Sequence, residues 1–510
     1  MWVRERGIGA PDPQKRVVTG WAGVERRPRL RSLRIVFVLA LLAVSAPALR
    51  AQVSAPPTSA DADAVPTPAA EVRQVVDAIA DALWAEAALP GFAVAVGTSA
   101  GGIVFSGAYG WADLENRAPA SPLTRWRIGS VSKTLTAAGA MLLAERGMLD
   151  PDATVAEILP GWERRPAGRA TVRQLAGHLG GVRHYREGEG ISHVHYPSVE
   201  DALGLFADDS LVALPGETYD YSTFGYVLLS GLMARAAGEP FLDFLQREVL
   251  APLGMRQTGP DLATRLVPWR ASFYEIRDGR TVPAPFTDNS YKWAGGGLLS
   301  TPEDLVRFGI GLLDHRILSA ASVATLFTSQ RTTAGEETGY GMGFRPRSDW
   351  AGRRVVHHGG SSEGGRAFLL LYPDQGVVVA MAANRAAAPL FEEEAQVFAH
   401  FFVDHGAADA RIDRELAGSW IVEGALGDDR FEGTLRLSAS GRERGELEWG
   451  AAGGPIQIVI VDRHGEEMRL VGAGAHGVMV AWIEPARGGW AGRWEYLGQS
   501  GELVLREAVP

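Results

Sequence analysis

The 510-residue sequence is 46% hydrophobic and 22% charged, a composition typical of a folded protein with room for two domains. Its formal net charge of −10, with no long basic run beyond the amino-terminal segment, argues against nucleic-acid binding. The absence of cysteine excludes disulfides, thiol nucleophiles and cysteine metal sites, and the few histidines disfavour a metal enzyme.

The first 51 residues have the pattern of a secretory signal peptide. Residues 26–34 are basic, residues 35–49 form an apolar run, and small residues surround Ala51. The apolar run is short for a membrane span, although an uncleaved anchor is the alternative, and the long start suggests that the true first residue lies further along. We predict export to the periplasm or extracellular space, no stable membrane span after cleavage, and a disordered linker over residues 52–69.

The folded part is predicted to begin with a helix and a β-hairpin. Apolar residues recur at helical spacing over residues 70–89. Residues 92–96 and 103–109 have the composition of two strands joined by a small-residue turn. Gly129 then ends an extended segment, and Ser130 is predicted to open an amphipathic helix.

The middle of the chain is mostly helical, and strands return after it. Helical patterns extend over residues 155–254, and another helix is predicted over residues 301–313. The returning strands are expected at residues 354–357, 367–372 and 377–382, with a last helix at 392–404. We therefore predict an α+β domain over residues 70–405. An antiparallel sheet is flanked by helices and carries an inserted helical half, with the site in the cleft between them.

The last hundred residues have a different pattern. Seven or eight short strand candidates follow one another about every ten residues, separated by turn residues. Residues 411–510 are therefore predicted to form a small all-β domain, either a barrel or a sandwich. Its opening, Leu-Ala-Gly-Ser-Trp at residues 416–420, resembles the start of lipocalin-like barrels. A packed accessory domain is favoured over a lipid-binding cup.

A serine and a lysine stand one turn apart at the start of the central predicted helix. Ser130 and Lys133 are three residues apart, so their side chains share one face. A helix N-terminus favours developing negative charge, which suits a nucleophilic hydroxyl beside an amine that can accept its proton. Only positions 15, 133 and 292 are lysine, whereas arginine fills nearly every other basic position. Because arginine cannot lose its proton, Lys133 indicates chemistry, the alternative being a solvated helix lysine.

Two further motifs accompany this pair. Residues 219–226, Tyr-Asp-Tyr-Ser-Thr-Phe-Gly-Tyr, lead into a predicted helix, and residues 355–361, Val-Val-His-His-Gly-Gly-Ser, end a strand in a glycine-rich turn. In this order and at these separations, the three motifs resemble the superfamily of class C β-lactamases, D,D-peptidases and esterases. Residues 178–185 and 288–297 are similar to the mitochondrial-type serine β-lactamase-like proteins, a branch associated with peptidase activity. The resemblance covers about residues 72–404 and implies a β-lactamase/transpeptidase-like fold.

The resemblance implies roles for the residues that match the first two motifs. Ser130 would be the acylated nucleophile and Lys133 its hydrogen-bonded partner. Tyr221 would be a general base, because positive neighbours can lower the pKa of a tyrosine. Thr223 replaces the family's asparagine, and its hydroxyl lacks the carboxamide that recognises a β-lactam side chain.

The third motif departs from the Lys-Thr-Gly of β-lactamases. His357 stands at the lysine position, where it would donate a hydrogen bond or, when protonated, supply a charge. Gly359 and Gly360 would let substrate approach the strand. The N–H groups of Gly360 and Ser130 are the expected oxyanion hole.

Other candidate residues receive no catalytic role. His193 and His195 are spaced like a metal pair but are more typical of a loop, and Lys292 either lines the cleft or is solvated. No metal and no organic cofactor are expected.

The sequence therefore predicts an exported serine hydrolase that forms an acyl-enzyme with peptide or small ester or amide substrates. Peptidase activity ranks first, esterase second, and β-lactamase or D,D-peptidase activity proper is the alternative. A non-catalytic penicillin-binding-type sensor is the competing class, and the intact Ser130, Lys133 and Tyr221 favour the enzyme. The expected partner is a small-molecule or peptide substrate rather than nucleic acid, and the oligomeric state is left open.

Overall fold

The computed structural model describes residues 70–403, 416–426, 429–437, 445–449, 455–464, 466–496 and 499–508. The predicted signal peptide and linker therefore lie outside the described residues, as does the segment between the two predicted domains. Within the described ranges, no helix combines the length and the apolar composition that crossing a membrane requires.

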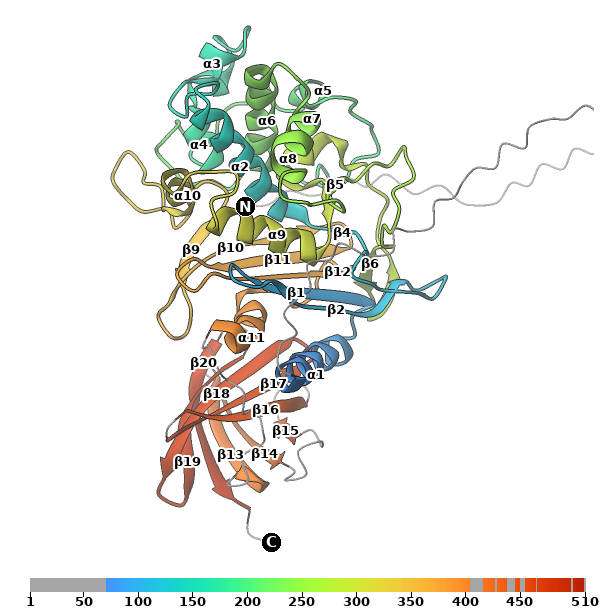
Figure 1. Ribbon diagram of the computed structural model, residues 1–510, viewed down its shortest axis with the longest axis vertical. Coiled ribbons are helices and arrows are strands. Elements are labelled where there is room, and N and C mark those ends of the chain that lie inside the picture. The colour runs from blue at the N-terminus through green and yellow to red at the C-terminus, as the bar shows by residue number, and fades with distance from the viewer. Residues whose placement is uncertain are drawn as a thin grey trace, which may run out of the picture. The chain divides into compact units, whose positions relative to one another are not determined.

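A seven-stranded antiparallel sheet lies at the centre of the first domain (Figure 1). Its strand order is β3-β2-β1-β12-β11-β10-β9. The chain enters through helix α1 (Ala70–Glu86) and strands β1 (Gly91–Thr98), β2 (Gly102–Asp113) and β3 (Ala118–Pro119). It returns through β9 (Arg345–Ser348), β10 (Arg354–Ser362), β11 (Gly365–Tyr372) and β12 (Val377–Ala383). Because β12 pairs with β1, the returning strands complete the sheet, as the sequence predicts.

The two faces of the sheet belong to two different hydrophobic cores. Along β1, Ala93 and Ala95 pack with the helical half, whereas Phe92, Val94 and Val96 pack with α1 and with α11 (Glu392–Val403). This alternation follows from the two-residue period of a strand. Since both faces are covered, the central strands β1, β11 and β12 are nearly continuous apolar runs.

The inserted half consists of helices and short strands around a buried central helix, α2 (Ser132–Glu145). The other helices are α3 (Val155–Ile158), η2 (Pro166–Arg169), α4 (Val172–Ala176), α5 (Val199–Leu203), α6 (Thr223–Ala237), α7 (Phe241–Leu245), η3 (Gln246–Leu250), η4 (Asn289–Lys292), α8 (Trp293–Gly296), α9 (Pro302–Leu313) and α10 (Ala320–Phe327). The short strands are β4 (Trp126–Arg127), β5 (Gly259–Pro260), β6 (Tyr274–Arg277), β7 (Arg280–Pro283) and β8 (Leu298–Ser300).

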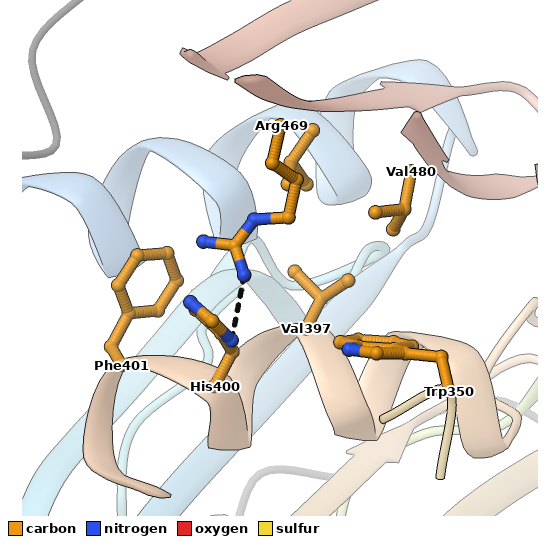
Figure 2. Close-up of a pocket in the computed structure, with 7 residues that line it drawn as sticks. Trp350, Val397, His400, Phe401, Arg469 and Val480 are labelled. Atoms are coloured by element: carbon orange, nitrogen blue, oxygen red, sulfur yellow. Dashed lines mark hydrogen bonds between the residues drawn. The ribbon is translucent and has the colours of Figure 1, made fainter. Parts of the chain in front are cut away.

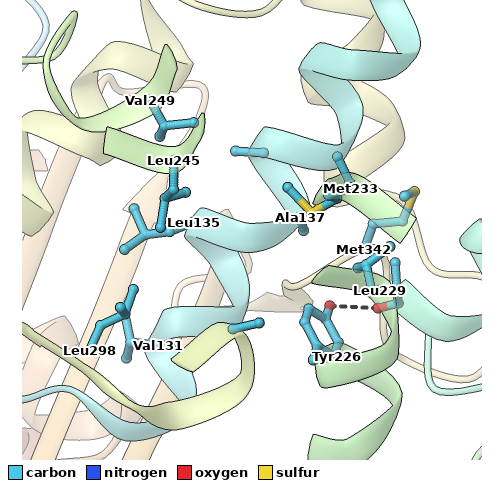
Figure 3. Close-up of a cluster of buried hydrophobic side chains, with 14 of the residues drawn as sticks. Val131, Leu135, Ala137, Tyr226, Leu229, Met233, Leu245, Val249, Leu298 and Met342 are labelled. Atoms are coloured by element: carbon cyan, nitrogen blue, oxygen red, sulfur yellow. Dashed lines mark hydrogen bonds between the residues drawn. The ribbon is translucent and has the colours of Figure 1, made fainter. Parts of the chain in front are cut away.

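The prediction that Ser130 opens an amphipathic helix is wrong in two respects. Ser130 lies in a 3₁₀ turn, η1 (Gly129–Val131), and every residue of α2 from Ser132 to Leu143 is buried. Figure 3 shows apolar side chains from several elements around this helix. The buried threonines of this helix form internal hydrogen bonds, as when Thr136 Oγ1 donates to the carbonyl oxygen of Ala294 at 2.8 Å. The helix is therefore the buried centre of its half.

The carboxy-terminal region is a closed antiparallel barrel, one of the two predicted architectures. Its strands are β13 (Gly418–Leu426), β14 (Asp429–Leu437), β15 (Gly445–Trp449), β16 (Ile456–His464), β17 (Glu467–Gly474), β18 (Gly477–Ala486), β19 (Gly489–Tyr496) and β20 (Gln499–Glu507). Large rings pack on one another in its core, with the centroids of Trp449 and Trp494 at 5.3 Å.

Strands β17 and β18 of the barrel contact the sheet domain through α1 and α11. Val471, Val480 and Trp482 belong to the same apolar core as the outer face of the sheet. Figure 2 shows a small pocket at this contact, where Arg469 Nη1 donates to His400 Nδ1 at 2.7 Å. The pocket is remote from Ser130, because its lining residues all come from the outer side of the sheet and from the barrel.

Candidate active site

Ser130 lies in the tight turn that precedes α2. Gly129 has a positive φ of 48°, and a Cβ at this position would lie 2.5 Å from the backbone oxygen of Ser361 in β10. The glycine therefore allows the turn to approach the end of β10 closely. Ser130 follows at the N-terminus of α2, where backbone N–H groups and the helix dipole favour negative charge.

Lys133 is fully buried one turn further along and makes three hydrogen bonds. Its Nζ lies 3.1 Å from Ser130 Oγ, 3.1 Å from Thr223 Oγ1 and 2.5 Å from the carbonyl oxygen of Gly295. Burial, and secondarily the charge of Lys292, hold the pKa of Lys133 well below the usual value for lysine. A neutral amine has two N–H donors and one lone pair. It can therefore donate to Thr223 and Gly295 while accepting from Ser130.

Tyr221 lies beside this pair, but its electrostatics differ from the prediction. Its ring centroid is 4.7 Å from Lys133 Nζ, and its side chain forms a hydrogen bond with Ser130. Burial raises the pKa of Tyr221, and the hydrogen bond to Ser130 and the charge of Arg345 only partly oppose this effect. The expectation of a lowered pKa is therefore wrong, because a buried phenolate loses more hydration than its cationic neighbours replace.

Thr223 is brought into the site by the first turn of α6. Ser222 caps this helix by accepting a hydrogen bond from the N–H of Gly225 at 2.9 Å. The hydroxyl of Thr223 contacts Lys133, and its backbone N–H donates to His184 Nδ1 at 3.3 Å. Thr223 thus presents a small hydroxyl that is bound to Lys133, whereas an asparagine at this position would present a longer carboxamide.

The two histidines of β10 point to opposite faces of the sheet, and the predicted one faces away from Ser130. Val355 packs with the α1 and α11 core and Val356 with the helical half, so alternation places His357 with the former and His358 with the latter. His357 Nε2 lies 3.2 Å from Glu392 Oε2 of α11. The assignment of His357 to the reaction centre is therefore wrong.

His358 occupies the position that was predicted for His357. Its ring centroid lies 6.3 Å from that of Tyr221. Burial and the charge of Lys133 lower the pKa of His358 well below its usual value. In the neutral ring, Nδ1 donates to the oxygen of Gly359 at 2.6 Å and Nε2 accepts from the hydroxyl of Tyr340 at 2.9 Å.

The register of β10 also changes the predicted oxyanion donor. Val356 lies opposite Pro346 of β9, and proline has no N–H, so the hydrogen-bonded pairs on this edge are those of residues 355 and 357. Continuing the alternation, the N–H of Ser361 points to the same edge of β10 as that of His357, whereas the N–H of Gly360 points to β11. A Cβ on Gly360 would lie 1.9 Å from the oxygen of Ile128, so this glycine permits the close approach instead.

The site holds two further cations, of which the sequence analysis missed Arg345 and gave Lys292 no catalytic role. Arg345 of β9 donates to the hydroxyl of Tyr219 at 3.0 Å, and its guanidinium lies 6.0 Å from the Tyr221 ring. It forms no ion pair with any residue that the structure describes. Lys292 is buried, neither solvated nor merely lining the cleft, and its Nζ is 2.9 Å from Glu363 Oε2. A lone arginine in an arginine-rich chain carries no sequence signal, whereas the scarcity of lysine already singled out Lys292.

His195, one of the two spaced histidines, has an acidic partner. Its Nδ1 lies 2.9 Å from Asp288 Oδ2, and Asp288 also caps η4 by accepting from the N–H of Ser290. His193 stacks on Phe286 with ring centroids 5.9 Å apart. Over the ranges that the structure describes, no three histidine or carboxylate side chains are grouped as metal ligands.

Comparisons with known proteins agree with this arrangement. The family model described as Beta-lactamase matches residues 76–400. The human "Serine beta-lactamase-like protein LACTB, mitochondrial" is 32% identical over 297 residues, which are 45% of this chain and 54% of that protein. "Penicillin-binding protein 4*" of Bacillus subtilis is 26% identical over 305 residues, or 56% of this chain and 66% of that protein. The chain thus spans about half the length of the first of these curated relatives.

The fold also has solved counterparts. The structure of the octameric penicillin-binding protein homologue from Pyrococcus abyssi aligns with a TM-score of 0.54 and 20% sequence identity. The alignment covers 82% of this chain and 97% of that one, so it extends beyond the residues of the family model. At this level of identity the likeness supports the fold alone.

Proposed function

The chain belongs to the beta-lactamase family, since the family model matches well over half of it, and on this premise we propose that it hydrolyses its substrates through an acyl-enzyme at Ser130. The observation that carries the proposal is the 3.1 Å contact between Ser130 Oγ and the buried amine of Lys133. The low pKa of that amine favours the neutral form, which a proton acceptor requires.

In the acylation step, Ser130 Oγ attacks the substrate's acyl carbon. The hydroxyl proton moves to Lys133 Nζ as the new C–O bond forms, and the carbonyl electron pair moves onto oxygen. The N–H groups of Ser130 and Ser361 then stabilise this oxyanion, a contribution worth about 10²-fold or more in rate for each donor.

Tyr221 acts in the next step as a proton donor rather than as a phenolate base. Its phenol delivers a proton to the leaving group as the bond to the acyl carbon breaks, and it regains a proton from the ammonium of Lys133. The raised pKa of Tyr221 supports this assignment, because it favours the protonated form. Water then hydrolyses the ester, returning Ser130 and Lys133 to their starting states.

The cation Arg345 supports peptides as the first substrate class. It lies within 6.0 Å of the Tyr221 and Tyr340 rings and no described carboxylate neutralises it. A peptide that carries a free carboxylate beyond the cleaved bond would supply that missing charge. Small esters and amides rank second. β-Lactams rank third because Thr223, whose hydroxyl is bound to Lys133, offers no carboxamide.

Covalent labelling tests the proposal. A fluorophosphonate probe should label the wild type on the peptide that contains Ser130, and Ser130→Ala should abolish labelling without loss of fold. Ser132→Ala is the matched control, because this neighbouring serine is buried within α2, and it should keep the label. Labelling that survives in Ser130→Ala would refute the nucleophile.

Turnover separates the enzyme from a penicillin-binding-type sensor. An enzyme releases product and regains its free serine, whereas a sensor stops at the acylated state. We expect steady turnover of short peptides or acyl esters, with kcat/KM above that of penicillins and cephalosporins. Stoichiometric acylation without turnover would instead favour the sensor.

We also propose export and a division of the chain near residues 405–411. Export is supported by the basic and apolar segments of residues 26–49, and the division by the change from the helix-flanked antiparallel sheet to the closed barrel. Amino-terminal sequencing of the protein recovered from a secreting host would test the first proposal. Cleavage after the amino-terminal apolar run is the expected result.

A further inference from the structure

Both lysines of the described chain lie in the same site. The sequence has lysine at positions 15, 133 and 292 only, and position 15 falls in the segment that the structure leaves undescribed. Lys133 is 0% exposed and Lys292 is 4% exposed. Elsewhere the chain uses arginine, so a second buried lysine near the nucleophile needs its own explanation.

The two lysines are connected through one short helix, α8, which Lys133 contacts and Lys292 precedes. Lys133 Nζ donates to the carbonyl oxygen of Gly295, inside that helix. Lys292 immediately precedes α8, and its Cδ lies 4.0 Å from where a Cβ on Gly296 would be. The side chain of Lys292 therefore runs past the residue next to the one that Lys133 binds.

The charge of Lys292 has partners that Lys133 lacks. Its Nζ donates to Glu363 Oε2 at 2.9 Å and to the oxygen of Gly190 at 3.3 Å. It also lies 5.2 Å from the ring centroid of Tyr291. Burial lowers the pKa of Lys292, and Glu363 counteracts that effect. Lys133, in contrast, contacts only hydroxyls, a carbonyl and aromatic rings in its hydrogen bonds and ring contacts.

Other ionisable groups surround both lysines. Those around Lys133, from α6, β10 and the loops before them, are His178, His184, Tyr221, Tyr226 and His358. Burial lowers the pKa of all three histidines, which favours their neutral forms. Those around Lys292 are Arg127, Tyr185, Asp261, Tyr291 and Glu363. The charge of Arg345 also lowers the pKa values of His178, His358 and Tyr221.

We propose that Lys292 is a positioning residue for acylation, whose ammonium, anchored by Glu363, disfavours a second positive charge on Lys133 and so keeps Lys133 able to take the proton of Ser130. This inference rests on the proposed function and deepens it. The cause is repulsion between like charges on two buried side chains, which costs more there than in water. Glu363 fixes which of the two lysines carries the charge.

The pH dependence of Ser130 labelling by the fluorophosphonate probe tests this role. The second-order labelling rate should fall on the acid side as Lys133 becomes protonated. Lys292→Met keeps much of the apolar stem but removes the charge. In this variant the midpoint of the acid limb should move to higher pH by about one unit. Lys292→Arg keeps the charge and should restore the wild-type limb. A merely structural role would lower the rate equally at every pH.

Two controls keep the test decisive. Lys292→Met/Glu363→Gln leaves no orphan carboxylate, so it should fold even where the single variant does not, and its limb should still lie above that of the wild type. An unmoved limb in the folded neutral variants would overturn the role of Lys292. A wild type that is not labelled at Ser130 at all would instead refute the proposed function, so the two failures are distinguishable.

Discussion

Both faces of the central sheet bury ionisable groups, but the partners of these groups differ between the two faces. On the inner face, Lys133 and His358 are buried bases whose hydrogen bonds go to hydroxyls, carbonyls and tyrosines. On the outer face, His357 pairs with Glu392, and Glu394 accepts backbone N–H groups from Phe391 and from Val478 of the barrel.

The difference separates chemistry from assembly. A buried base without a carboxylate partner is held in its neutral form, which is the form that takes a proton from a nucleophile. On the outer face, Glu394 instead joins α11 to the barrel by accepting from the N–H of Val478, and Glu392 of the same helix lies beside His357. Neighbouring histidines in one strand therefore lie in different environments, because strand alternation sends their side chains to opposite faces.

Removing the inner-face base should have the largest effect. Lys133→Met keeps a buried unbranched side chain but has no lone pair on nitrogen, so kcat/KM should fall by about 10³-fold. Lys133→Arg should be similarly inactive, because a guanidinium cannot accept the proton. Steady-state kinetics measure this effect, and circular dichroism checks the fold. Near-normal turnover in either variant would contradict the assignment of Lys133 as the proton acceptor.

The two histidines give the next largest contrast. His358→Ala removes the partner of Tyr340 beside Tyr221, and we expect kcat/KM to fall by about tenfold to 10²-fold. His357→Ala, the matched control from the opposite face, should leave kcat/KM within about threefold of wild type. The reverse order would show that the register of β10 is misassigned.

A smaller effect is expected from Arg345. Arg345→Met should lower kcat/KM for a peptide with a free terminal carboxylate by about tenfold or more, as expected for a lost charge-assisted hydrogen bond. The same peptide with an amidated terminus should be little affected, which provides the control within one experiment. Equal losses for both peptides would exclude carboxylate recognition by Arg345.

The smallest effect concerns the outer face. Burial raises the pKa of Glu394 to about 7, whereas an unfolded glutamate titrates near 4.3. The folded state therefore binds this proton more tightly. The stability that protonated Glu394 contributes is present below the pKa of the unfolded state and is lost as pH rises through the pKa of the folded state. Glu394→Gln removes this dependence, so the Tm difference between wild type and variant should change by a few °C between about pH 5 and pH 8.

A Tm difference that stays constant across this range would show that Glu394 is already ionised in the folded protein at acid pH. The hydrogen bond from the N–H of Val478 would remain as its structural role. Because the variant and the wild type share every other titrating group, their difference isolates this carboxylate.

Much of this arrangement is accessible from the sequence, for identifiable reasons. The barrel strands and the sheet follow from local patterns, and Ser130, Lys133 and Thr223 follow from motif spacing. The choice between His357 and His358 depends on which face of the sheet Val355 and Val356 cover, and two adjacent valines carry no local signal for that. The partner of Lys292 is 71 residues away in sequence, and the raised pKa of Tyr221 depends on burial by distant elements.

The most direct test of the central claim is the protonation state of Lys133 itself. With lysine at three positions only, protein labelled with ¹³C at the lysine ε-carbons gives few NMR signals, and the signal that disappears in Lys133→Met is that of Lys133. The account predicts that the Lys133 signal has the shift of a neutral amine near neutral pH, whereas an exposed lysine titrates near 10.4. A Lys133 signal that remains that of an ammonium up to such an alkaline pH would contradict it.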